Sequence, residues 1–363
     1  MISSLAQGCD ASTTHSILSA RRFGAARRYT LDGVPVEAVA SLGTLFSTPL
    51  APGYIPAFVR RARSADVVVH HAPLPLNDAA ILLGLPDDTA LIVYWHADVV
   101  GYPLLRRLVA PLIRRALARA DRIVVSGQPM IDHSEFLRPH AEKCAVLPYG
   151  MDLDYWRTLD ADGRARAEEL ERQQPRHIVA LGRLVGYKGY DALIRAMQTV
   201  DGHATIIGEG PLLADLQRLA TELGVSSRIR FAGRLPRDEI KQLFHSAQVF
   251  AFPSVTEAEA FGIVQIEAMA TGLPIVNTNL PTTVPLVARH NLEALTVAPG
   301  DPQALSQALN CILDDPALGE RLGSAGQQRA MSEFDQAAFR TRMTAIYKDA
   351  QRTRKDRLVA RRT

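Results

Sequence analysis

Short apolar runs rich in β-branched residues alternate with helical patterns along the chain. A first set predicts buried strands at 16–20, 34–39, 67–70, 91–94 and 123–125. A second set predicts strands at 178–181, 205–207, 229–231, 249–252 and 275–276. Near-continuous apolar strands with helices between them are typical of parallel sheets covered on both faces. The pattern therefore predicts an α/β protein of two doubly wound units.

A polar segment separates the two sets of strands. Pro148-Tyr149-Gly150 punctuates the end of the first set, and the charged stretch 160–174 predicts a solvated helix that ends at Pro175. We therefore expect an N-terminal domain over 1–155, a linker helix over 156–175, a second domain over 176–335, and a C-terminal helix with a basic tail over 336–363.

The opening of the chain departs from the doubly wound pattern. Such a unit ordinarily begins with a strand, a glycine-rich turn and a helix. Here the sequence begins on a helical pattern over 1–7 and continues to the strand at 16–20. The sequence thus predicts an N-terminal domain without its first strand and glycine-rich loop, and with an open sheet edge.

Charge and cysteine usage narrow the class of protein. The chain has 41 basic and 38 acidic side chains, which is too balanced for a dedicated nucleic-acid binder. Cys9, Cys144 and Cys311 lie far apart, so neither a disulfide framework nor a zinc site is predicted. No apolar run reaches the roughly 18–20 residues of a membrane span. We expect a cytoplasmic protein without a nucleic-acid partner.

The strongest motif follows the predicted strand at 249–252. A loop leads to a helix that begins near Gly262 and ends at Gly272. The free N–H groups at the start of this helix suit a pyrophosphate, and Gly262 lets it approach the backbone. Glu267, one turn into the helix, is suited to accept hydrogen bonds from a ribose diol. Glu259, in the loop before the helix, is suited to accept from sugar hydroxyls.

Two further loops follow predicted strands in the second domain. In Gly182–Gly189, Arg183 and Lys188 supply two cations in a glycine-flanked loop, which suits a diphosphate. Gly208-Glu209-Gly210-Pro211 lacks the third glycine of a dinucleotide fingerprint, so it predicts a tight turn near a nucleotide. Gly233 ends the next strand, where its backbone can edge a nucleobase.

In this order, these motifs resemble those of the retaining glycosyltransferases of family 4, across almost the whole second half of the chain. The resemblance implies a GT-B fold of two facing Rossmann-like domains. It implies that the nucleotide sugar is bound by Arg183, Lys188, Gly208, Gly233, Phe261, Gly262, Ile263, Val264 and Glu267. It also implies that Glu259 holds the donor sugar.

The first half resembles the acceptor domain of this family. Members often place a histidine after a strand beside the reacting sugar, which implies that role for His96. His96, Arg183, Lys188 and Glu259 are therefore the candidate catalytic residues. Asp152-Leu153-Asp154 spells a DxD, which binds a metal in other folds, but here we expect it to shape the linker. We expect no metal and no cofactor besides the nucleotide-sugar substrate.

The resemblance implies retaining transfer of a hexose, and we favour mannose from GDP-mannose, to a glycan or lipid-linked glycan in polysaccharide biosynthesis. The segment 102–120 predicts an amphipathic helix, kinked at Pro111, with arginines beside leucines. With the basic tail, it predicts peripheral binding to the anionic inner face of a membrane. Two alternatives stay open: a nucleotide-sugar epimerase on a similar fold, and a truncated non-catalytic scaffold that binds nucleotide.

Overall fold

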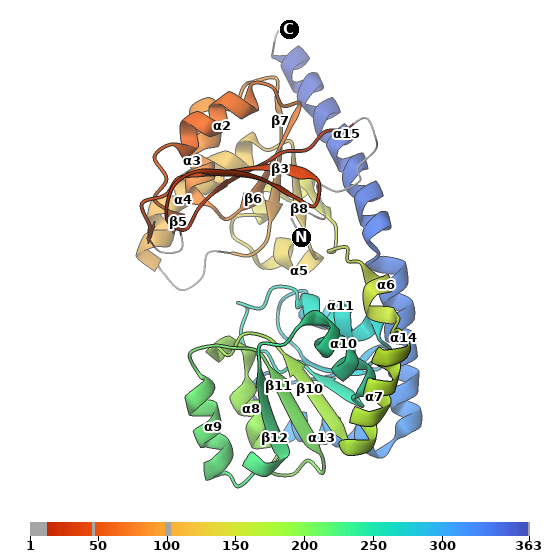
Figure 1. The fold of residues 1–363 in the computed structure, drawn as a ribbon. Coiled ribbons are helices and arrows are strands. Elements are labelled where there is room, and N and C mark those ends of the chain that lie inside the picture. The colour runs from red at the N-terminus through yellow and green to blue at the C-terminus, as the bar shows by residue number, and fades with distance from the viewer. Residues whose placement is uncertain (1–12, 46–47, 99–102, 362–363) are drawn as a thin grey trace. The chain divides into compact units, whose positions relative to one another are not determined.

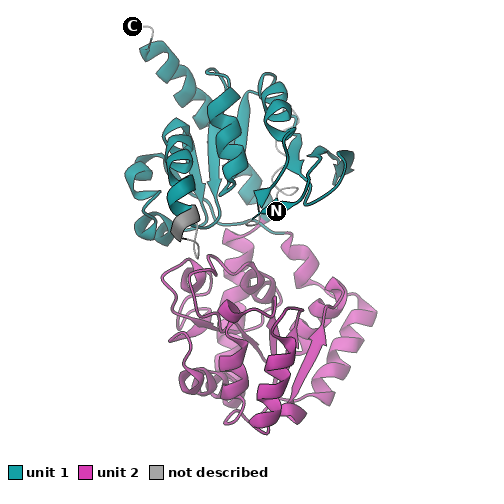
Figure 2. Ribbon diagram, turned by 90° about the vertical axis from the view of Figure 1, so that its left-hand side faces the viewer, with its two compact units in different colours: residues 1–151, 336–363 teal, residues 152–335 magenta. Residues whose placement is uncertain are grey.

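The computed structural model describes residues 13–45, 48–98 and 103–361, with side chains described from Arg106 in the last range. The chain divides into two compact units. Unit 1 comprises Met1–Met151 and Gln336–Thr363, and unit 2 comprises Asp152–Asp335 (Figure 2).

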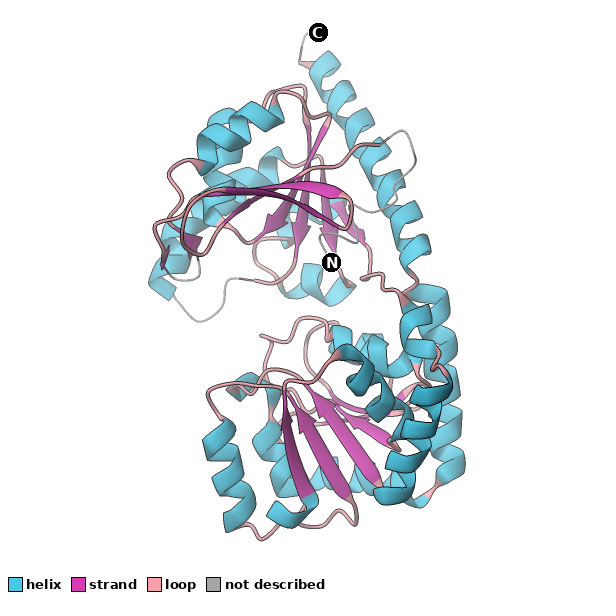
Figure 3. Cartoon of the chain, in the orientation of Figure 1, coloured by secondary structure: helices cyan, strands magenta, loops and turns pink. Residues whose placement is uncertain are grey.

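Unit 2 is built on a parallel sheet of six strands in the order β12-β11-β10-β13-β14-β15 (Figure 3). The strands are β10 (His177–Leu181), β11 (His203–Ile207), β12 (Ile229–Gly233), β13 (Val249–Ala251), β14 (Ile275–Thr278) and β15 (Ala294–Val297). The chain runs outward from β10 to β12 and then returns to the other side of β10 as β13. This reversal creates a switch point, and in such sheets a crevice opens there outside the carboxyl ends of the strands.

Helices cover both faces of this sheet (Figure 1). They are α6 (Leu153–Arg157), α7 (Ala161–Gln173), α8 (Tyr190–Ala196), α9 (Leu213–Glu222), α10 (Arg237–Ser246), α11 (Ile263–Ala270), α12 (Val284–Val287), α13 (Pro302–Asp314) and α14 (Pro316–Glu333). On one face Ile206 shares a buried cluster with Leu193 of α8 and Leu309 of α13. On the other, Phe250 packs edge-on to Phe244 of α10, with centroids 5.4 Å apart. The alternation of buried side chains along the strands thus builds two apolar layers.

The segment expected as a separate linker belongs to unit 2. Its helices begin at aspartates: Asp152 accepts from the N–H of Tyr155, and Asp160 accepts from the N–H of Gly163. Helix α7 packs against α10. The segment expected as a separate C-terminal helix, α15 (Gln336–Ala360), belongs to unit 1. The chain therefore passes between the units twice.

Unit 1 contains a parallel sheet in the order β6-β7-β8-β9, a second sheet in the order β1-β3-β2, and the antiparallel pair β4-β5. Their bounds are β1 (Ile17–Ala20), β2 (Arg27–Leu31), β3 (Val34–Val39), β4 (Thr44–Leu45), β5 (Thr48–Pro49), β6 (Val67–Ala72), β7 (Ala90–Trp95), β8 (Arg122–Val125) and β9 (Cys144–Val146). Residues 1–12, on which the expectation of a missing first strand rests, lie outside the described residues. Within the described part, β1 pairs with β3 and β6 pairs with β7.

The central strand β7 is buried along its whole length. Val93 joins a cluster with residues of α2 (Tyr54–Ala62), α3 (Pro75–Gly84) and α4 (Pro103–Arg119). Helix α15 packs against β7 and β6, and α5 (Gln128–His133) follows β8. Two arginines of α15 complete the docking: buried Arg354 donates to the carbonyl oxygen of Asp87, and Arg357 donates to Oδ1 of Asp121 at 3.1 Å. These two cations of the expected basic tail are therefore engaged within unit 1.

Candidate functional site

The switch point of unit 2 brings together two loops that are far apart in sequence. Because β10 and β13 are parallel neighbours, the loops that follow them leave the same edge of the sheet. The N–H of Val255 donates to the carbonyl oxygen of Tyr187 at 2.8 Å and joins these loops. Gly189 adopts φ 66°, and a Cβ there would lie 2.0 Å from the carbonyl oxygen of Pro253. Glycine is therefore required for the first loop to lie this close to the second.

Lys188 and Glu259 meet at this junction. Their Nζ and Oε2 atoms lie 2.5 Å apart, and each side chain is only 12% exposed. Ser254 donates to Oε2 of Glu259 at 3.3 Å, and Lys188 Nζ lies 5.1 Å from the ring centroid of Phe252. The sequence predicted the cation and the carboxylate as separate ligand groups; the structure pairs them, and Ser254 and Phe252 complete a cluster that sequence analysis missed.

Arg183 is exposed and lies in the same loop as Lys188. Burial raises the pKa of Tyr187, the charge of Glu259 raises it further, and the charge of Arg183 lowers it. The charges of Arg183 and Glu259 therefore both reach the hydroxyl of Tyr187 and shift its pKa in opposite directions. Arg183 has no ion pair with any described residue, which leaves its guanidinium available for an anion.

The start of α11 faces this loop junction with no side-chain cap and no acidic residue in its first turn. Gly262 precedes the helix at φ 78°, and a Cβ there would lie 2.7 Å from the ring of Phe252. The ring of Phe261 is buried against Phe334, so Phe261 has only its backbone to offer a ligand. Ile263 is partly exposed, as is Val264. An uncapped helix start with this backbone geometry can bind an anion through its N–H groups.

Glu267 lies one turn further along α11 and is largely buried. Burial raises its pKa to about 7, and the nearby charge of Arg237 opposes that shift. Glu267 forms no hydrogen bond or ion pair with any described residue. Arg237 stacks 4.3 Å from the ring centroid of Tyr155, whose hydroxyl donates to Asp238 at 2.7 Å. The carboxylate of Glu267 is thus free to accept hydrogen bonds from a diol. Sequence analysis did not single out Tyr155 or Arg237.

The glycines at 208, 210 and 233 shape the same edge of the sheet. A Cβ on Gly208 would lie 2.0 Å from the carbonyl oxygen of Gly182, and one on Gly210 would lie 2.2 Å from that of Leu184. The N–H of Gly208 donates to the carbonyl oxygen of Gly233 at 2.8 Å. Gly208 and Gly210 therefore hold the loop of Arg183 in place, whereas a Cβ on Gly233 would meet no atom within 4 Å.

The DxD sequence has local partners. Asp152 caps α6, and Asp154 pairs with Arg157 at 2.9 Å. In the described part of the chain, no group of three or more His, Cys, Asp and Glu side chains is placed to hold a metal ion.

In unit 1, His96 lies at the end of β7 within a row of rings. Its Nε2 lies 2.8 Å from Nδ1 of His71, and its Nδ1 lies 2.9 Å from the hydroxyl oxygen of Tyr149. Tyr94 stacks on His96 with centroids 4.7 Å apart. The sequence predicted His96 but treated Tyr149 only as part of a turn. The available signal was that His71 and His96 follow the predicted strands 67–70 and 91–94, and that Tyr149 follows β9, at one edge of a parallel sheet.

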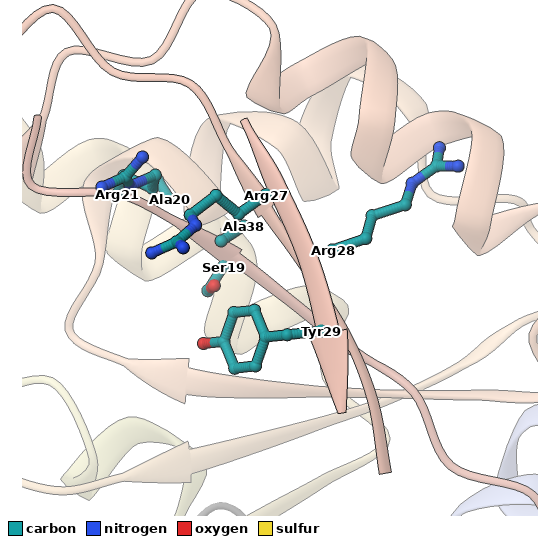
Figure 4. Close-up of a pocket in the computed structure, with 7 residues that line it drawn as sticks. All are labelled: Ser19, Ala20, Arg21, Arg27, Arg28, Tyr29 and Ala38. Atoms are coloured by element: carbon teal, nitrogen blue, oxygen red, sulfur yellow. The ribbon is translucent and has the colours of Figure 1, made fainter. Parts of the chain in front are cut away.

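A separate hollow of about 440 Å³ lies on the β1-β3-β2 sheet (Figure 4). Arg27 and Tyr29 extend from β2 to the same side as Ser19 and Arg21, whereas Arg28 extends away from them (Figure 4). The guanidinium groups give this hollow a positive charge that suits an anionic group. No motif in the sequence predicted it.

Helix α4 presents a basic outer face. Its exposed positions are Arg107, Leu108, Pro111, Arg114, Arg115 and Ala118. Arg114 shares Glu135 with Arg106, whereas Arg107 and Arg115 form no ion pair with any described residue. Pro111 lies inside the helix, and residue 102 lies outside the described residues. None of the described helices combines the length and apolar composition needed to cross a bilayer.

Comparison with known protein families gives two matches that together span most of the chain. Residues 1–150 match the model described as a glycosyl transferase 4-like domain, and residues 162–329 match the model described as glycosyl transferases group 1.

Curated relatives and solved structures agree with these matches. The D-rhamnosyltransferase WbpZ of Pseudomonas aeruginosa is 31% identical over 80% of this chain and 75% of its own length. A GDP-mannose-dependent alpha-(1-6)-phosphatidylinositol monomannoside mannosyltransferase of Mycolicibacterium smegmatis is 33% identical over 69% of this chain and 67% of its own. The structure of Anabaena HepE in complex with UDP superposes with a TM-score of 0.72 at 22% identity, covering 87% of each chain.

Proposed function

Because the chain belongs to the glycosyl transferases group 1 family, we propose that it transfers mannose from GDP-mannose to a glycan with retention of configuration. The donor is supported by the mycobacterial relative that is named for its dependence on GDP-mannose. The observation that carries the proposal is the convergence of Lys188, Glu259 and the open start of α11 at the switch point of unit 2.

The donor is held through its charged and its hydroxyl groups. Arg183, Lys188 and the N–H groups at the start of α11 neutralise the diphosphate. Glu267 accepts from the ribose diol, and Glu259 accepts from hydroxyls of the sugar. Since Lys188 is paired with Glu259 before the donor arrives, the incoming diphosphate competes for the cation, and the carboxylate is released towards the sugar.

In the transfer step, the bond between the anomeric carbon and the diphosphate oxygen breaks while a bond to the acceptor oxygen forms on the same face. The acceptor proton moves to the leaving diphosphate. The developing negative charge lies on the side held by Arg183, Lys188 and the helix N–H groups, which stabilises the transition state. These cations perform the electrostatic role directly, so we propose that transfer needs no metal. On the acceptor side, we assign the orienting of the sugar to the ring row that contains His96.

The acceptor we propose is a glycan or lipid-linked glycan at a membrane surface. Arg107 and Arg115 flank Leu108, which is 74% exposed, on the outer face of α4. A helix with basic and apolar groups on one exposed face is attracted to anionic lipid and inserts its apolar groups among the head groups. This supports peripheral binding, through which unit 1 reaches a lipid-linked acceptor.

Turnover of defined nucleotide sugars tests this function. The purified chain is incubated with GDP-mannose, UDP-glucose, ADP-glucose or dTDP-glucose, with and without an alkyl α-mannoside, in buffer containing EDTA. We expect GDP release that depends on the mannoside, and an α-linked product by NMR. Conversion of the donor to an epimer without acceptor would indicate an epimerase. Binding of nucleotide without turnover of any donor would indicate a non-catalytic scaffold.

A further inference from the structure

Three side chains at one end of unit 1 form a continuous hydrogen-bonded chain, and the phenol at one end of it also bonds the side chain of Ser126. Tyr149 bonds Nδ1 of His96, and Nε2 of His96 bonds Nδ1 of His71. The two imidazole rings lie almost parallel, with 5° between their planes, and Tyr94 stacks on both. Both nitrogens of His96 are therefore occupied within the protein. A ligand cannot hydrogen-bond that ring unless one of these bonds breaks.

The two histidines are neutral under ordinary conditions. Burial and the neighbouring His96 lower the pKa of His71 to about 3, and burial and the neighbouring His70 lower the pKa of His96 to about 4. A neutral imidazole carries one N–H and one bare nitrogen. The chain of three groups therefore has only two complete proton arrangements, which run in opposite directions.

The better-matched arrangement begins at the phenol. A phenolic O–H is a good donor and a bare imidazole nitrogen is a good acceptor, whereas a phenolic oxygen is a weak acceptor for an imidazole N–H. Burial raises the pKa of Tyr149, whereas the bond from Ser126 lowers it, as a donor to the phenol oxygen does. Tyr149 in turn donates to Nδ1 of His96. His96 must then carry its proton on Nε2 and donate to Nδ1 of His71, which leaves the proton of His71 on its own Nε2.

The preceding histidine gives a contrast within the same strand. His70 points to the opposite face of β6, is fully buried, and uses both nitrogens: Nε2 lies 2.8 Å from Oδ1 of Asp78, and Nδ1 lies 2.6 Å from the amide of Asn77. Both ring nitrogens of His70 are thus bonded inside the core, where no ligand reaches them. His71 is partly exposed, contacts no carboxylate, and its Nε2 bonds no described residue.

We propose that Tyr149 and His96 position His71, and that Nε2–H of His71 is the hydrogen-bond donor that this ring row presents to an oxygen of the acceptor glycan. The proposal rests on the proposed function and deepens it. His96 then acts through His71 as a positioning residue. The sequence analysis assigned the sugar contact to His96, at the end of β7. This proposal assigns it to His71, at the end of the neighbouring strand β6.

Nitrogen NMR of the histidine-labelled full chain tests the positioning step without any ligand. Long-range proton–nitrogen spectra distinguish the two tautomers, and we expect both His71 and His96 to carry the proton on Nε2. In Tyr149→Phe, the donor to His96 is lost and its two tautomers should mix. A wild-type His96 protonated on Nδ1, or a spectrum unchanged in Tyr149→Phe, would overturn the proposal.

Two substitutions of His71 distinguish the roles of its two ring nitrogens. His71→Asn places a side-chain acceptor where Nδ1 was but offers nothing at Nε2, whereas His71→Gln places an amide N–H near Nε2. We expect His71→Asn to keep the tautomer of His96 and lose five- to tenfold in kcat/KM, and His71→Gln to retain more activity than His71→Asn. Full activity in His71→Asn would rule out the donor role.

The NMR and kinetic experiments also distinguish a failure of this proposal from a failure of the proposed function. If the wild-type chain turns over no nucleotide sugar, the function fails while the tautomers can still be measured. If the chain is active but the tautomers are reversed, the function stands and the positioning role of Tyr149 and His96 fails. Circular dichroism of each variant checks that it is folded.

Discussion

Glu267 is a carboxylate that the fold holds in an unfavourable place. It is largely buried on α11, it has no hydrogen-bond partner among the described residues, and its pKa rises to about 7. A buried charge without a partner destabilises the folded state. Such a group is a candidate for ligand binding, because a bound diol would supply the missing hydrogen bonds.

The free energy of unfolding should report this cost. Between the ordinary pKa of 4.5 and the folded value of about 7, the folded chain binds more protons than the unfolded chain, so stability falls as pH rises through that window. Glu267→Gln removes the titration. We expect the variant to exceed wild type by up to about 3 kcal/mol at pH 8 and to match it near pH 4. Urea titration followed by Trp156 fluorescence, in a Trp95→Phe background, measures this for unit 2. A variant less stable than wild type at pH 8 would contradict it.

Individual residues of the donor motif were predictable because each follows a strand in a sheet whose loops leave one edge. Lys188, Glu259 and Glu267 were found in this way, and their roles stay predictions. The pairing of Lys188 with Glu259, and the hydrogen bonds that join His71, His96 and Tyr149, were not predictable. They depend on which side chains of different strands point to the same side, which spacing along one sequence does not specify.

At the scale of elements, apolar runs located ten strands, all of which occur in the structure within a few residues. The strands that were not predicted carry a weaker signal. β2 has the sequence Arg27-Arg28-Tyr29-Thr30-Leu31 and is exposed throughout. It has no buried face, so its sequence lacks the apolar run that predicts a strand. β4 and β5 have two residues each, and β9 has three. β15, at the edge of its sheet, has four. Edge and hairpin strands of this kind are defined by their pairing partners.

The close packing of the loops that follow β10 and β13 predicts what a glycine-to-alanine substitution does at their contact. Gly189→Ala combines a left-handed backbone with a Cβ 2.0 Å from the carbonyl oxygen of Pro253. Gly224→Ala is the matched control, because φ is 69° there and a Cβ would meet nothing within 4 Å. We expect Gly224→Ala to cost about 1–2 kcal/mol from backbone strain alone. Gly189→Ala should cost clearly more and also weaken nucleotide binding. Equal effects of the two substitutions would show that the loop contact is dispensable.

For the whole molecule, the prediction of a GT-B fold and of family membership is confirmed. The sequence predicted the last helix but not the unit on which it packs; buried Arg354 and the ion pair of Arg357 with Asp121 fix it to unit 1. Those contacts also use tail charges that were expected to face a membrane. Lys355 and Arg361 of the same tail remain exposed.

If α4 binds a membrane, binding should depend on where the arginines lie in the protein as well as on the total charge. We expect the chain to co-sediment with vesicles containing phosphatidylglycerol at low salt. Replacing Arg107 and Arg115 by serine should weaken binding by about tenfold or more, at roughly 1 kcal/mol for each arginine. Replacing Arg164 and Arg166, which are exposed on α7, makes the same change of charge elsewhere and should have less effect. Absence of co-sedimentation at low salt would contradict the proposal.

Calorimetric binding of GDP-mannose tests the central claim most directly, because it needs no acceptor. Wild type is compared at pH 8 with Glu267→Gln, and with Glu222→Gln as a control in an exposed ion pair on α9. We predict that GDP-mannose binds in preference to UDP-glucose, that Glu267→Gln weakens binding at least tenfold, and that Glu222→Gln binds as wild type does. Undiminished binding in folded Glu267→Gln, or no binding of any nucleotide sugar by the folded wild-type chain, would contradict the account.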